Sequence, residues 1–120
     1  MIVIKKFVPL RLESLNKTNN RKFGYKNYHD RIFRDGALFL QVQKKKPDVI
    51  RRVTVKYCHT SKRLFDDENL SGAFKPVFDL LVRLKYLHDD SAKWCVRVYE
   101  QERVSNKDVV GCWIIVEDVE

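Results

Sequence analysis

The sequence has 120 residues, of which 44% are hydrophobic and 33% charged, as expected of one globular domain and not of a disordered chain. No apolar run approaches the ~18 residues of a membrane-spanning helix, and the start lacks the order of a signal peptide, so we expect an intracellular, cytoplasmic protein. The net charge of +8 is uneven: residues 1–63 carry 17 Lys and Arg against 4 Asp and Glu, whereas residues 64–120 carry 7 against 12. Such a basic half attracts polyanions, which points to a nucleic-acid partner without establishing one.

The basic half contains the first two predicted elements. Residues 1–8 alternate as a strand, residues 14–27 are polar and rich in turn formers, and residues 28–43 have apolar side chains near helical spacing. The basic run Lys44–Lys46 suits the negative end of a helix dipole, and Pro47 would stop the helix there. The apolar positions of this predicted helix are Tyr28, Ile32, Phe39 and Val42.

Next come a strand and a second helix. Residues 50–58 alternate apolar and polar side chains, which predicts a half-buried strand with Val53, Val55 and Tyr57 on one face. Residues 70–85 place Leu70, Phe74, Val77, Leu81 and Leu84 on one helical stripe. Because a helix interior loses a hydrogen bond at proline, Pro76 predicts either a kink or a helix that begins near Lys75.

Two strand-like segments end the chain, residues 92–104 and 109–117, and residues 105–108 between them are typical of a hairpin loop. We therefore expect an α+β fold: a small mixed sheet with two helices, in the order β-α-β-α-β-β, forming one domain over residues 1–120.

Cysteine, histidine and tryptophan residues predict structure more than chemistry. Cys58, Cys95 and Cys112 are odd in number and widely spaced, so we expect buried apolar side chains and neither zinc nor disulfides. The three histidines are too scattered for a zinc triad, and His88 is expected at the surface. Trp94 and Trp113 lie in apolar strands and are expected in the core.

Two dense acidic clusters flank the second helix, Asp66-Asp67-Glu68-Asn69 and Asp89-Asp90. Two carboxylates ~4 Å apart repel by roughly 1 kcal/mol in water, so gathering several is unfavourable unless a positive group compensates them. Hard cations such as Mg²⁺ and Mn²⁺ prefer oxygen ligands, which suggests metal-assisted attack on a phosphodiester. The structural alternative is that Asp67 or Asn69 caps the helix and that the Asp pair is a solvated turn.

The segment from Arg63 to Asp90 resembles the signature of the RusA family of Holliday-junction resolvases. The resemblance rests on Arg63-Leu-Phe-Asp66-Asp67-Glu68-Asn69-Leu70, Lys75-Pro-Val-Phe-Asp79 and Leu87-His-Asp89-Asp90. The family signature is an acidic D-x-D-N motif, a helix lysine with an aspartate four residues later, and a D-D pair opening the next strand. Asn19-Asn20 also looks like the family's amino-terminal region, so the resemblance extends over essentially the whole chain.

The resemblance assigns roles to individual residues. Glu68 stands where the family commonly has aspartate, and Lys75 comes six residues after Asn69 where about three are expected. The implied catalytic residues are Asp66, Glu68, Lys75 and Asp90, the implied metal ligands are Asp66, Glu68, Asp89 and Asp90, and the supporting residues are Asp67, Asn69 and Asp79.

What the resemblance implies is a homodimeric endonuclease, often phage- or prophage-encoded, that cuts four-way DNA junctions with Mg²⁺ or Mn²⁺. Two alternatives remain: a non-catalytic branched-DNA-binding protein that has lost activity, and an accessory factor whose acids are only helix caps. Metal-dependent turnover separates the first interpretation from the other two. The predicted DNA-binding residues are Lys17, Arg21, Lys22, Lys44, Lys45, Lys46, Lys62 and Arg63.

A straight helix between the acidic clusters would hold them apart. A helix of ~15 residues is about 22 Å long, too long for Glu68 and Asp89 to share a metal within one subunit. Either the chain turns back after Leu84 through residues 85–88, or a two-fold dimer brings Asp89-Asp90 of one subunit to Asp66 and Glu68 of the other.

Overall fold

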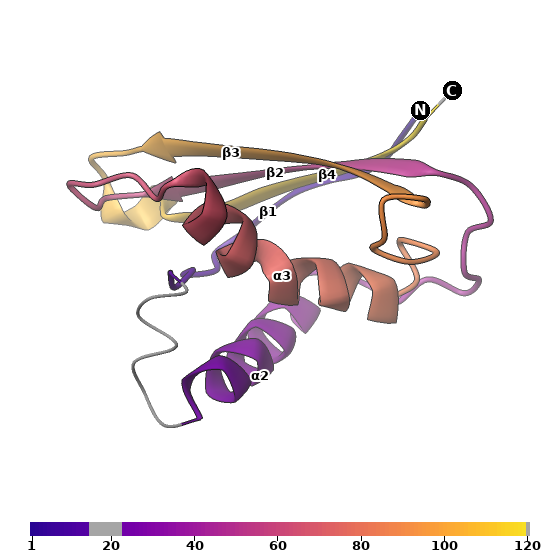
Figure 1. Ribbon diagram of the computed structural model, residues 1–120, viewed down its shortest axis with the longest axis horizontal. Coiled ribbons are helices and arrows are strands. Elements are labelled where there is room, and N and C mark those ends of the chain that lie inside the picture. Colours follow the sequence, from indigo (N-terminus) through magenta and orange to yellow (C-terminus); the bar gives the residue numbers. More distant parts are fainter. Residues whose placement is uncertain (15–22, 120) are drawn as a thin grey trace.

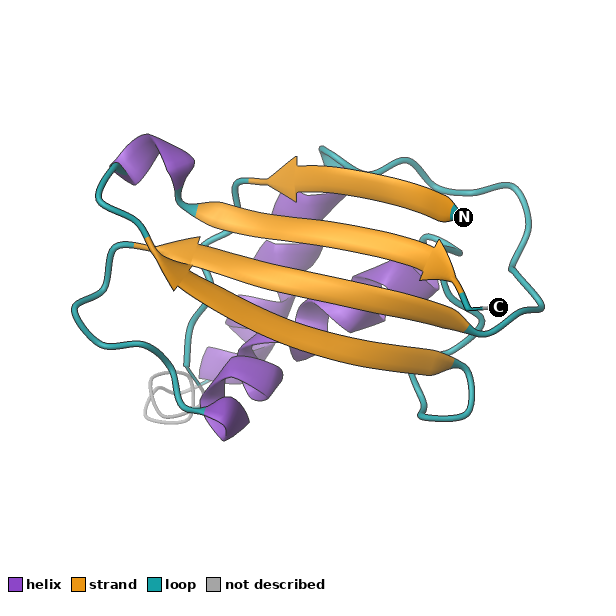
Figure 2. Cartoon of the chain, turned by 90° about the horizontal axis from the view of Figure 1, so that it is seen from above, coloured by secondary structure: helices purple, strands orange, loops and turns teal. Residues whose placement is uncertain are grey.

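The computed structural model describes residues 1–14 and 23–119, and it confirms the predicted order of strands and helices. Both helices lie on one face of a four-stranded mixed sheet, and the opposite face is uncovered (Figures 1 and 2). This is an α+β architecture. The elements are β1 (Ile2–Val8), α2 (Gly24–Ala37), β2 (Arg51–His59), α3 (Asp67–Arg83), β3 (Cys95–Arg103), the 3-10 turn η1 (Lys107–Val109) and β4 (Gly111–Asp118).

The strand order is β1-β4-β2-β3, so the predicted hairpin between the last two strands is wrong. β4 pairs antiparallel with β1 and β2, while β3 runs parallel to β2 at the edge of the sheet. Burial explains the arrangement: Cys112, Ile114 and Val116 of β4 are fully buried, whereas Cys95 is the one buried residue of β3. The more apolar strand takes the central place, and the polar strand forms an edge.

The first helix is displaced from its predicted position. α2 begins at Gly24 and ends at Ala37, so the Lys44–Lys46 run lies in the loop that follows and does not end a helix. Tyr28 and Ile32 face the core as expected, but Phe39 and Val42 are outside the helix and exposed. Gly36, near the end of α2, lies where a Cβ would collide with the Leu80 side chain of α3. The glycine therefore allows the two helices to pack closely at this point.

The second helix is continuous through Pro76, so a start near Lys75 is wrong. Its apolar stripe packs on the helix-facing side of the sheet, where the alternation predicted for the β2 strand is confirmed. The largest buried side chains come from both layers and include Phe74, Val77, Phe78, Leu81, Val53, Val55 and Ile114.

The three cysteines are buried and free, as predicted, but Trp113 is not in the core. It lies on the uncovered sheet face, 37% exposed, with its ring 5.4 Å from that of Phe7. In the described part of the chain, no helix is long and apolar enough to cross a membrane.

Candidate functional site

The first acidic cluster forms the amino-terminal end of α3. Asp66 is the N-cap, because its Oδ1 accepts from the Asn69 backbone N–H at 2.8 Å, and its Oδ2 accepts from the Asn69 side chain at 3.1 Å. The cap therefore falls on Asp66, and not on Asp67 or Asn69 as the structural alternative had it. Asp67 and Glu68 are exposed in the first turn, where the helix dipole favours negative charge.

The carboxyl end of α3 turns the chain back toward the middle of the helix. Lys85 is left-handed (φ 69°), its N–H donates to Val82 O at 3.1 Å, and the N–H of Tyr86 donates to Leu81 O at 2.9 Å. These two bonds form the Schellman motif that ends many helices. Tyr86 and the following Leu87 are buried, which fixes the direction of the return.

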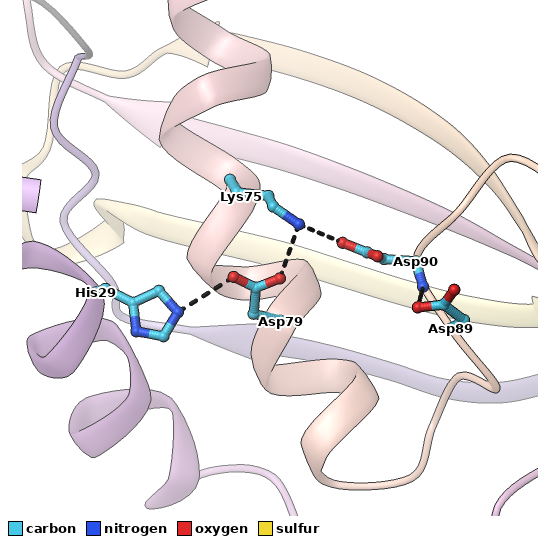
Figure 3. A network of polar contacts seen from close by, with 5 residues as sticks. All are labelled: His29, Lys75, Asp79, Asp89 and Asp90. Atoms are coloured by element: carbon cyan, nitrogen blue, oxygen red, sulfur yellow. Dashed lines mark hydrogen bonds and ion pairs between the residues drawn. The ribbon is translucent and has the colours of Figure 1, made fainter. Parts of the chain in front are cut away.

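This return brings the second acidic cluster to Lys75, halfway along α3 (Figure 3). The Lys75 ammonium lies 2.6 Å from Asp90 Oδ2 and 2.9 Å from Asp79 Oδ1. Asp79 also contacts His29 of α2, with Nε2 3.1 Å from Oδ2, and Asp89 Oδ1 accepts from the Asp90 backbone N–H at 2.9 Å. Two helices and one loop thus supply a single polar network.

Charge pairing stabilises this network in its ionised form. The hydrogen bond to Asp90 raises the pKa of Lys75 well above its ordinary value, and Asp79 adds to that shift. The same bond from Lys75 lowers the pKa of Asp90. The result is a fixed ammonium between two carboxylates, one of which lies on the loop.

The two acidic clusters do not meet within one chain. Lys75 follows Asp66 by nine residues, and at ~1.5 Å per residue that is about 13 Å along the helix axis. Among the described residues, no three His, Cys, Asp or Glu side chains lie close enough together to hold a metal ion. The four predicted ligands therefore do not form a closed metal site in a single described chain.

Five of the eight predicted DNA-binding residues lie in the described chain, on two exposed loops. Lys62 and Arg63 lie directly before α3, next to the first acidic cluster, and Lys44–Lys46 lie between α2 and β2. Lys17, Arg21 and Lys22 fall outside the described residues, as do Asn19 and Asn20.

His29 is a member of the network that the sequence did not indicate. It is separated from Asp79 by 50 positions, and only the packing of α2 on α3 brings the two together. His88, expected at the surface, is half-buried against Trp94, with ring centroids 3.9 Å apart.

A comparison with models of known protein families gave no match, and no curated protein matches the sequence significantly.

The pairing of Asp90 with Lys75 predicts a pH-dependent contribution to stability. Since the pKa of Asp90 is lowered in the folded state, its contribution is present above the ordinary value of 3.8 and is lost as the pH falls through the lowered pKa. We expect Asp90→Asn to reduce the free energy of unfolding at neutral pH by about 1 kcal/mol or less, because Lys75 is half-exposed. Denaturant unfolding from pH 7 down to pH ~2 measures this. A difference that does not shrink in acid would contradict the assignment.

Proposed function

We propose that this chain is a metal-dependent endodeoxyribonuclease that cleaves branched DNA, with four-way junctions as the model substrate, and that it acts as a homodimer. The observation that supports this most is the convergence of Lys75, Asp79 and the loop residue Asp90 at the middle of α3, the helix that Asp66 caps and whose first turn carries Glu68. These are the positions at which the sequence resembles the RusA signature.

The network gives Lys75 a defined electrostatic role in this proposal. Its ammonium is charged at neutral pH and held in place by two carboxylates, so it needs little reorganisation to face a phosphodiester whose negative charge grows during cleavage. Lys62 and Arg63 lie beside the first acidic cluster and would draw the DNA backbone toward acids that otherwise repel it.

The requirement for Mg²⁺ or Mn²⁺ is part of the proposal. Magnesium commonly takes only one or two protein carboxylates, with waters and substrate phosphates as its other ligands. Asp66 and Glu68 at one position, or Asp89 and Asp90 at the other, provide such a pair, and a bound metal would polarise the phosphate and activate water. Neither pair is a closed site by itself.

Incubation of a labelled four-way junction with the purified protein tests the function. We expect cleavage with Mg²⁺ or Mn²⁺, none with EDTA, and much slower cleavage of a linear duplex of the same sequence. Lack of cleavage with either metal, at protein concentrations that saturate the junction, would refute the nuclease proposal.

A second candidate is a branched-DNA-binding protein without catalysis. It is favoured because the acids already have partners within the chain: Asp66 Oδ1 caps α3, Asp66 Oδ2 accepts from the Asn69 side chain, and Asp90 is paired with Lys75. Such a protein would bind junctions tightly but leave them intact with every metal, which the same experiment detects.

The basic loops predict the salt dependence of binding under either candidate. We expect that neutralising Lys44–Lys46, Lys62 with Arg63, or Lys17, Arg21 and Lys22 flattens the log–log salt slope by about one unit for each phosphate that the variant no longer neutralises. Fluorescence anisotropy over a salt series measures the slope. If the slope stays unchanged in all three variants, these residues do not contact the DNA backbone and another surface binds DNA.

A further inference from the structure

A side chain from β3 holds the loop that leads into α3. Gln101 Oε1 accepts from the Phe65 backbone N–H at 2.9 Å, and Gln101 Nε2 donates to the Phe65 carbonyl at 2.6 Å. The side-chain amide thus pairs with one residue as a neighbouring strand would, using a donor and an acceptor in the same plane. Phe65 immediately precedes Asp66, so this pairing ends one residue before the first acidic cluster.

A buried histidine supports the amide. His59 is 2% exposed, its Nε2 lies 3.3 Å from the same Gln101 Oε1, and its ring stacks on Tyr57 at 4.6 Å. Since Oε1 only accepts, His59 donates from Nε2, and its Nδ1 is buried with no hydrogen-bond partner in the described chain. Burying the Nδ1 atom without a partner costs free energy, so an apolar ring at position 59 would be more stable if the side chain only filled space.

The Phe65 ring also restrains this loop, because it lies 5.8 Å from the Tyr57 ring and 5.4 Å from the His59 ring of β2. Among the described residues, no backbone–backbone hydrogen bond holds residues 60–65. One more hydrogen bond to this loop comes from β3, where the Arg103 side chain donates to the carbonyl of Lys62 at 3.0 Å. In the described chain, the hydrogen bonds to the backbone of residues 60–65 therefore come from side chains of β3, while the Phe65 ring packs against β2.

We infer that Gln101 is a positioning residue: by holding Phe65, it sets where Asp66 and Glu68 stand relative to the DNA backbone. This inference rests on the proposed nuclease function. Without the two Gln101 hydrogen bonds, α3 remains packed from Leu70 onward, but the backbone at Phe65, directly before Asp66, is held less tightly. Small displacements of catalytic groups reduce rates far more than they reduce binding.

Gln101→Leu, which removes both hydrogen bonds, tests the inference. We expect the single-turnover rate of junction cleavage to fall about 10- to 100-fold, while junction affinity changes less than about twofold. Gln101→Glu keeps the shape and the acceptor but loses the donor to Phe65, and it serves if the leucine variant fails to fold. Glu100→Leu, an exposed neighbour on the same strand, is the matched control and should cleave normally.

Amide spectra of the same variants separate this inference from the proposed function. In the wild type, the Phe65 N–H should be protected from hydrogen exchange, and in Gln101→Leu we expect that protection to be lost and the Asn69 amide resonance, which reports on the Asp66 cap, to shift. An unprotected Phe65 in the wild type, or an unmoved Asn69 resonance in the variant, would overturn the inference even if the protein cleaves nothing. A normal cleavage rate after loss of protection would also overturn it.

Discussion

Replacing Asp66 or Asp90 with asparagine is expected to lower the rate of junction cleavage at least about a hundredfold, while junction affinity stays the same or rises. Under the proposed function, both variants remove a negative charge that would face phosphates, so binding should not suffer. The structure makes Asp66→Asn a clean test, because asparagine is as good an N-cap as aspartate and keeps the bond to the Asn69 N–H. The loss then reflects charge and not unfolding of α3.

Cleavage rates and anisotropy on the same junction measure both quantities. Asp30→Asn is a suitable control, because Asp30 is an exposed acid on α2 that pairs with Lys26 of the same helix. Wild-type cleavage by either the Asp66 or the Asp90 variant would show that the assignment of the acids is wrong.

Local patterns predicted the elements better than their pairing. Alternation in β2 identified Val53 and Val55 as core residues, and both are fully buried. The strand order was wrong because chain proximity suggested a hairpin between β3 and β4, while burial of Ile114 on β4 favoured a central position. α2 was misplaced because Phe39 and Val42 continued an apolar spacing beyond Ala37, where the helix ends and both side chains are exposed.

In the candidate site, too, contacts between near neighbours in the sequence could be predicted and contacts between distant residues could not. Lys75 and Asp79 lie four residues apart on a helix, so their contact follows from spacing alone. The contact of Lys75 with Asp90 depends on the left-handed Lys85, which no glycine or asparagine marks in the sequence. His29 and Gln101 reach their partners across 50 and 36 positions, and such contacts follow only from the packed fold.

The return after Leu84 bears on whether a catalytic site is complete within one subunit. It brings Asp90 as far as Lys75, which leaves about 13 Å of helix between that point and Asp66. A self-contained site would use only one acidic cluster or would need the DNA to bridge both. A shared site would instead place Asp89 and Asp90 of one subunit near Asp66 and Glu68 of its partner, as two-fold symmetry allows.

Mixed dimers decide between these arrangements. If sites are shared, a dimer of an Asp66→Asn subunit and an Asp90→Asn subunit has one site with both lesions and one that is intact, so we expect nicking of the junction to return. About half of randomly assembled dimers would be mixed, and the nicking recovered by the whole mixture should approach a quarter of the wild-type number of active sites. If sites are self-contained, every site carries one lesion and the mixture stays inactive.

Different tags on the two co-expressed proteins allow the mixed dimers to be isolated. The doubly tagged fraction is assayed on a labelled four-way junction beside each inactive homodimer. Nicking by the doubly tagged fraction, with none by either homodimer, would rule out self-contained sites, because no single subunit in that fraction retains both acids.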